Sequence, residues 1–139
     1  MVEQWLKAID EPGSVGATDG QLDAAEKALG IELPDDYCAM MQRVNGGEAE
    51  LGESYVRFWP VEELAEMNEG YRVGEFRPGL TYFGTNGGGE AFALDWRPNR
   101  RAQYVVIPFI SLGDEGMIPC GDSLEDFLAT LHRGIPFGA

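Results

Sequence analysis

The stretch YFGTNGGGEAFALDW, Tyr82 to Trp96, places three consecutive glycines between two runs of β-favouring side chains. Glycine-rich loops of this kind either bind phosphate groups or close β-hairpins. Gly84 and Gly89 have the spacing of a phosphate-binding loop, but such a loop continues with Lys and then Ser or Thr, where this chain has Glu90 and Ala91. A carboxylate there repels phosphate, and a strand follows instead of the required helix. The stretch therefore predicts a β-hairpin.

Further strands and helices flank this hairpin on both sides. SYVRFWP, before it, alternates as a strand does, and YVVIPFI, after it, is a continuous apolar run typical of a buried strand. A polar acidic loop is predicted from Glu48 to Glu53, and another loop over residues 10–17. Apolar periodicity and capping residues predict helices over about residues 2–9, 18–29, 34–44, 61–71 and 123–133. We expect the sheet to centre on the hairpin and the third run.

Length and composition are those of an ordinary globular domain. At 139 residues the chain is long enough for one domain, and a chain of this size buries roughly 68% of its unfolded surface. Hydrophobic residues make up 44% of the chain and aromatic residues 11%. This composition favours a folded protein over a disordered one. We expect the chain to fold without a disulfide or a metal.

The chain is strongly acidic. Ten Lys and Arg residues stand against 24 Asp and Glu residues, a net charge of −14. This charge repels nucleic acids and anionic lipid surfaces, so neither is an expected partner. It either keeps the protein soluble or steers it toward a basic protein, and composition does not separate these uses. No apolar run reaches the ~18 residues of a membrane span, and the N-terminus does not read as a signal peptide. We therefore expect a cytoplasmic protein.

The sequence contains no complete catalytic or metal-binding pattern. Cys38 and Cys120 form no Cys-x-x-Cys pair and are predicted as buried free thiols. Ser54 and Ser123 lack the final glycine of a nucleophile elbow. His132, the single histidine, falls in the last turn of the predicted C-terminal helix, where positive charge is favourable. We expect no enzyme activity, no cofactor and no metal, although carboxylate pairs among so many acids leave acid–base chemistry open.

Two charged clusters have both a structural and a functional interpretation. Asp35 and Asp36 could act as an acid and base pair, but at the start of a predicted helix they are better explained by the helix dipole. Arg97, Arg100 and Arg101, in the segment WRPNRR, could bind an anion or form a solvated loop. Neither cluster specifies a reaction.

In this order, the motifs resemble the SUKH superfamily, which is named in part for a yeast regulator of cell-wall assembly and is common among bacterial immunity proteins. LGIELPDDYCAMMQRVNGG is similar to an LP-x-x-Y helix ending in N-G-G, and FWPVEEL to an aromatic strand end with its following helix. GTNGGGEAFALD resembles the glycine-rich hairpin and DSLEDFLATL the closing helix, so the resemblance covers about residues 18–133. The matching residues are Leu33, Pro34, Tyr37, Asn45, Gly46, Gly47, Phe58, Trp59, Glu63, Leu64, Gly84, Gly87, Gly88, Gly89, Phe92, Asp95, Ser123, Phe127, Leu128 and Leu131.

The resemblance implies an α+β fold in which a central, mostly antiparallel sheet is flanked by helices, with residues 1–139 as a single domain. It also implies a non-catalytic protein-binding role. Many bacterial members are thought to be immunity proteins that bind and neutralise a cognate polymorphic toxin, often a nuclease or a deaminase. The fungal member suggests an alternative, a regulatory scaffold that binds a cellular protein. The partner would be a toxin or another protein, and the acidic charge favours a basic one.

Trp59, Glu90 and Asp95 are the candidate partner-binding residues. Trp59 and Asp95 correspond to typical family positions. Strand alternation in EAFALDW places Asp95 on the face opposite Phe92 and Leu94, so a core on the bulky face would present Asp95 from the other one. Two structural roles compete with binding: Trp59 could pack at the end of its strand, and Asp95 could accept backbone hydrogen bonds.

Overall fold

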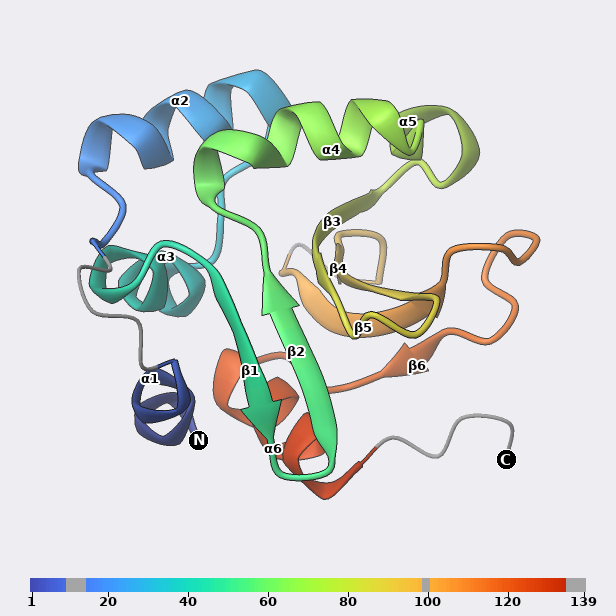
Figure 1. The fold of residues 1–139 in the computed structure, drawn as a ribbon. Helices are drawn as coiled ribbons and strands as arrows, with labels where there is room; N and C mark the ends of the chain where they lie inside the picture. The colour runs from blue at the N-terminus through green and yellow to red at the C-terminus, as the bar shows by residue number, and fades with distance from the viewer. Residues whose placement is uncertain (10–14, 99–100, 135–139) are drawn as a thin grey trace.

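A computed structural model describes residues 1–9, 15–98 and 101–134, and within them six strands form one antiparallel sheet (Figure 1). Each strand pairs with the next in sequence, so the sheet order equals the chain order. The expected α+β fold with a mostly antiparallel central sheet is confirmed. The strands are β1 (Gly47–Leu51), β2 (Ser54–Phe58), β3 (Leu80–Thr85), β4 (Glu90–Asp95), β5 (Gln103–Pro108) and β6 (Ile118–Pro119).

Helices pack on both faces of this sheet. On one side α4 and α5 cross β3, with α2 lying beside α4; on the other, α6 packs against β2 and β5 (Figure 1). The helix α1 lies against β1 and α6. Within the described residues, no helix is long and apolar enough to cross a membrane. The helices are α1 (Val2–Ala8), α2 (Asp19–Leu29), α3 (Asp35–Arg43), the 3₁₀ turn η1 (Val61–Glu63), α4 (Leu64–Gly70), α5 (Val73–Phe76) and α6 (Leu124–Arg133).

Adjacent residues of β3 supply aromatic rings to opposite faces of the sheet. The Phe83 ring packs with Phe92 and Phe127 at centroid distances of 6.2 and 5.5 Å, inside the main core. The Tyr82 ring points the other way, where it contacts Tyr71 and Phe109 at 5.9 and 5.8 Å. A bulge between Tyr82 and Gly84 gives β3 one residue more than β4 at this point. The sheet therefore separates two aromatic clusters.

The glycine-rich stretch closes the β3–β4 hairpin, as predicted. Gly87 and Gly89 have φ angles of 75° and 101°, which residues with a β-carbon rarely adopt. The Asn86 side-chain oxygen accepts hydrogen bonds from the backbone N–H groups of Gly88 and Glu90, at 2.9 and 3.3 Å. Loop geometry and an asparagine side chain together explain the glycine run, and no phosphate site is needed.

Some local predictions were wrong. The acidic segment Glu48–Glu53 is not a loop throughout, because its first part belongs to β1. Glu48 and Glu50 point outward from this edge strand while Leu51 is buried, and pairing with β2 overrides the low strand propensity of glutamate. The predicted helix over 61–71 starts as a 3₁₀ turn, and α5 and β6 were not predicted. Of the predicted loop at 10–17, residues 10–14 lie outside the described residues.

Candidate functional site

Trp59 follows β2 and is buried, with 4% of its surface exposed. Its backbone N–H donates to the Phe83 carbonyl at 3.1 Å, and its ring stacks on Tyr71 at a centroid distance of 6.1 Å and an interplanar angle of 11°. Tyr71 in turn stacks on Phe109 at 4.6 Å. Trp59 thus has the packing role that competed with binding, but the ring it supports, Tyr71, is exposed.

Glu90 begins β4 and takes part in the hairpin turn. Its carboxylate accepts a hydrogen bond from the Asn86 side-chain amide at 2.8 Å. Its carbonyl accepts one from the Thr85 hydroxyl at 2.7 Å. The side chain is half-buried, so Glu90 stabilises the turn in which it lies.

Asp95, at the opposite end of β4, is 2% exposed and is not presented to solvent. It accepts hydrogen bonds from the Arg97 guanidinium at 2.8 and 3.1 Å and from the Arg97 backbone N–H at 3.0 Å. Burial alone raises the pKa of Asp95, but the hydrogen bonds and charge of Arg97 outweigh burial and hold that pKa below its ordinary value. Arg97 also binds Asp114 at 3.0 Å, so it is held by carboxylates, while Arg100 lies outside the described residues.

The three candidate residues therefore do not form one site. Glu90 and Asp95 occupy opposite ends of one strand, and Trp59 is covered by Tyr71. Each side chain instead supports a neighbouring element: a hairpin turn for Glu90, the Arg97–Asp114 link for Asp95, and the exposed Tyr71 ring for Trp59.

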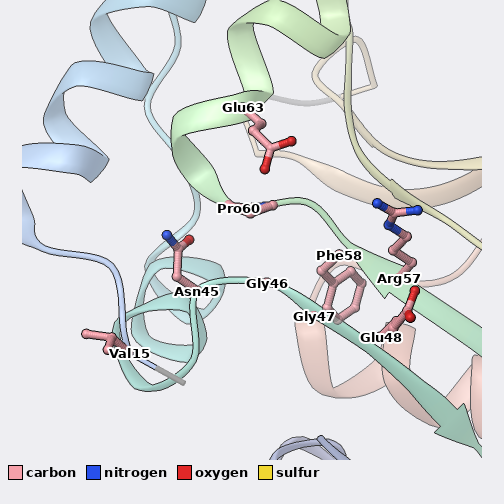
Figure 2. A pocket seen from close by; sticks show the side chains of 9 residues that line it. All are labelled: Val15, Asn45, Gly46, Gly47, Glu48, Arg57, Phe58, Pro60 and Glu63. Carbon is pink, nitrogen blue, oxygen red and sulfur yellow. The ribbon is translucent and has the colours of Figure 1, made fainter. Parts of the chain in front are cut away.

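A pocket of about 480 Å³ opens where the N-G-G and F-W-P motifs meet (Figure 2). The Asn45 side-chain oxygen accepts from the Val61 N–H at 2.9 Å, which joins the end of α3 to η1. A β-carbon on Gly46 would lie 2.8 Å from the Phe58 carbonyl oxygen, so only glycine fits beneath this segment. The pocket is lined by Val15, Asn45, Gly46, Gly47, Glu48, Arg57, Phe58, Pro60 and Glu63.

This first pocket is lined by few ionisable side chains. Its charged lining residues are Glu48, Arg57 and Glu63, two anions and one cation, and its lining contains no histidine, cysteine or serine. Elsewhere in the described residues, no group of three or more His, Cys, Asp or Glu side chains could hold a metal ion. Burial raises the pKa of the Cys120 thiol to about 11. Burial and nearby carboxylates do the same for Cys38, which is only half-buried.

A second pocket, of about 250 Å³, has a different character. Within the described residues five large apolar side chains are exposed, and one of them is Val15, at the first pocket. Three others line this second pocket, and the fourth, Ile110, lies between two lining residues. We call these four, Tyr71, Phe76, Ile110 and Leu112, the apolar rim. The second pocket is lined by Tyr71, Val73, Phe76, Arg77, Tyr82, Phe109, Ser111, Leu112 and Gly113.

The model of the SMI1 / KNR4 family (SUKH-1) matches residues 16–130 of this chain. The chain belongs to this family. A search of curated proteins finds no match. The match spans the motifs on which the resemblance was recognised, from the LP-x-x-Y helix to most of α6.

In this SUKH-1 protein the motif residues serve mainly to connect elements. Asn45 joins α3 to η1, and Phe127 of α6 packs on the Phe92 ring of β4 at 5.3 Å. Tyr37 contacts Phe83 at 5.6 Å. The motif residues therefore describe the fold. The family model also covers the apolar rim, but none of its four residues is among the motif residues matched in the sequence.

Sequence reasoning did not find the apolar rim of this SUKH-1 protein. A signal was present in YVVIPFISLG, where the apolar run continues beyond Pro108 to Leu112. That run was read as one strand up to Ile110, but β5 ends at Pro108 and the later residues form a turn. A proline inside an apolar run was the available sign that the strand stops there.

Proposed function

We propose that this SUKH-1 protein is a non-catalytic protein-binding domain, and that it acts as an immunity protein for a cognate toxin of nuclease or deaminase type. The observation that carries the binding role is the apolar rim. Contiguous exposed apolar side chains, here around a pocket, are typical of interaction sites. Family membership supports a toxin as the partner, because the family includes toxin-immunity proteins.

The charge of the chain supports a basic partner. With a net charge of −14, the protein attracts a basic toxin at long range and repels the nucleic acid on which a nuclease toxin acts. An acidic protein bound over the toxin's basic active site would exclude the toxin's substrate, because it would cover the positively charged surface that the substrate binds. No bond needs to be made or broken for neutralisation.

Co-expression with the product of a neighbouring toxin gene tests this function. We expect a stable complex that survives purification, and growth of cells that the toxin alone would kill. A genome with no such gene beside this one, together with no protection against candidate toxins, would contradict the toxin role. A stable partner recovered instead from toxin-free cells would favour the regulatory scaffold.

A further inference from the structure

We propose that the apolar rim and its 250 Å³ pocket are the docking surface of this protein, and that the occupant is a basic protein that inserts one apolar side chain into the pocket. This inference rests on the protein-binding role proposed above and assigns the surface and the partner chemistry. Five observations carry it: how Ser111 is held, how the loop is anchored at Asp114, what supports Tyr71, how large the pocket is, and which charges surround the rim.

Buried hydrogen bonds hold the loop that exposes Ile110 and Leu112. These two side chains are 97% and 86% exposed, while Ser111 between them turns inward. Arg77 is only 6% exposed, and its guanidinium donates to the Ser111 carbonyl at 2.9 Å and to the Ser111 hydroxyl at 2.7 Å. It also donates to the Tyr82 hydroxyl at 2.7 Å. The outward direction of the two aliphatic side chains is therefore imposed by a buried arginine.

A chain of ion pairs anchors the same loop farther along. Asp95 binds Arg97, and Arg97 binds Asp114, two residues after Leu112. The Glu115 N–H donates a hydrogen bond to the Leu112 carbonyl at 3.0 Å, which closes a turn. The loop is thus tied both to the end of β4 and to Arg77. An apolar surface that is ordered before binding loses little conformational entropy when a partner arrives.

Stacked rings support the aromatic side of the rim. The Tyr71 ring stacks on the Trp59 ring at an interplanar angle of 11° and on the Phe109 ring at 20°. Arg72 lies over the Phe76 ring at 5.0 Å. Rigid aromatic side chains, backed by buried ones, are the residues that dominate the energy of protein interfaces.

The size of the pocket selects one side chain over a small ligand. Its volume of 250 Å³ lies below the roughly 300–1,000 Å³ typical of small-molecule sites. Its walls combine aromatic and aliphatic side chains with polar ones, and Arg77 already binds the other two polar side chains, Tyr82 and Ser111. An apolar side chain fills such a space without leaving its own polar groups unpaired.

Charge decides between a basic partner and a second copy of this chain. Glu69, Glu75, Asp114 and Glu115 are exposed and flank the rim residues in sequence. Arg72 pairs with Glu75, and Arg97 pairs with Asp95 and Asp114, so within the described residues Glu69 and Glu115 are the carboxylates here that form no ion pair. The cation Arg77 lines the pocket but is buried and bound to Tyr82 and Ser111. Two copies, each with a net charge of −14, repel one another, whereas a basic protein is attracted.

Leu112→Asp and Val15→Asp form a matched pair for the test. Val15 is 77% exposed and lines the other pocket, so each variant replaces an exposed aliphatic side chain with a carboxylate. With the toxin that the wild-type protein binds, we expect affinity at least tenfold weaker for L112D and within twofold for V15D. Both variants add the same negative charge, so they change long-range attraction alike. A loss of affinity in L112D alone would therefore show that Leu112 contacts the toxin directly. Equal affinity of L112D and wild type would overturn the docking surface while leaving the proposed function intact.

A second measurement uses synthetic peptides and does not need the toxin. The peptide Lys-Lys-Phe-Lys-Lys, with blocked ends, is titrated into isotope-labelled protein and amide shifts are followed by NMR. We expect shifts at Tyr71, Phe76, Ser111 and Leu112 that weaken at least fivefold when Ala replaces the peptide's Phe or Glu replaces its Lys. No shifts there, or the same shifts in L112D, would overturn the proposal. Shifts at the rim without toxin binding would reject the toxin role alone.

Sedimentation of the free protein tests whether a second copy of this chain occupies the apolar rim instead. We expect a monomer at concentrations up to about 100 µM, because the charges of two copies repel. A dimer that L112D dissociates and V15D does not would overturn the basic partner in favour of self-association.

Discussion

Tyr37 and Tyr104 are both fully buried, yet only one of their hydroxyls has a hydrogen-bond partner among the described residues. Tyr104 donates to the Asp36 carboxylate at 2.8 Å, while the Tyr37 hydroxyl has no partner. Burial raises the pKa of both phenols above its ordinary value, which favours their neutral form. An unpaired buried hydroxyl costs about 1–3 kcal/mol, and a satisfied one stabilises.

We therefore predict opposite effects for two identical changes. Tyr37→Phe removes the unpaired hydroxyl and should raise the free energy of unfolding by about 1 kcal/mol. Tyr104→Phe removes a bond to a charged group and should lower it by about 1–2 kcal/mol. Urea denaturation of both variants measures the two values. A Tyr37→Phe variant less stable than wild type would show that this hydroxyl is satisfied in solution.

The lowered pKa of Asp95 predicts that the stability of the protein depends on pH. Because this pKa is lowered in the folded state, the contribution of Asp95 is present above the ordinary carboxyl pKa of about 3.9 and is lost as pH falls through the lower folded value. Asp95→Asn should cost about 1 kcal/mol at pH 7, a modest value because Arg97 is partly solvent-exposed. The difference in melting temperature between wild type and variant should shrink below about pH 4.

Asp122→Asn is the control for this pH series. Asp122 is exposed and forms no ion pair within the described residues, so its variant should follow the wild-type curve. If D95N and D122N respond to pH alike, the Asp95–Arg97 pair does not contribute to stability.

At the scale of elements, the hairpin shows that the glycines of one short segment differ in importance. Gly84 lies in β3 where β2 comes close, and a β-carbon there would sit 2.3 Å from the Arg57 carbonyl oxygen. Gly88, at the tip, has no positive φ, and the nearest atom to an added β-carbon is 3.6 Å away.

Gly84→Ala should destabilise the protein by about 2–3 kcal/mol, since backbone must move to admit a methyl group. Gly88→Ala should change stability by less than about 0.5 kcal/mol. Thermal unfolding of the two variants measures the contrast. A destabilising Gly88→Ala would mean that the tip makes contacts other than those described.

Contacts between elements also explain why Asp36 was only partly understood from sequence. The helix dipole accounts for an acid at the start of α3. In the structure its carboxylate also accepts hydrogen bonds from Tyr104 at 2.8 Å and from the Leu124 N–H at 2.7 Å, residues 68 and 88 positions away. Local pattern predicts the first role, and only the fold creates the second.

At the scale of the whole molecule, the net charge of −14 opposes compaction. The Debye length falls from about 30 Å at 0.01 M salt to about 10 Å at 0.1 M, so added salt screens this repulsion. We predict that the melting temperature rises by a few degrees between about 0.01 and 0.3 M sodium chloride. Tetramethylammonium chloride should act equally if screening is the cause. A melting temperature that falls with salt would mean that favourable ion pairs outweigh the repulsion.

The sequence by itself determined the hairpin, the antiparallel α+β fold, the family and the acidic charge. The hairpin and the separate elements follow from local patterns, namely glycines at a turn, alternation in a strand and capping residues, and the charge follows from a count. The antiparallel fold was implied by the resemblance of the ordered motifs to a known family. The sequence did not determine which side chains stay outside. Trp59 is covered because Tyr71 stacks on it, Asp95 is buried against Arg97, and Leu112 is exposed because Arg77, far earlier in the chain, holds Ser111 inward. Periodicity assigns a residue to a face of its own element, but exposure depends on what other elements place against that face, and only the tertiary structure decides that.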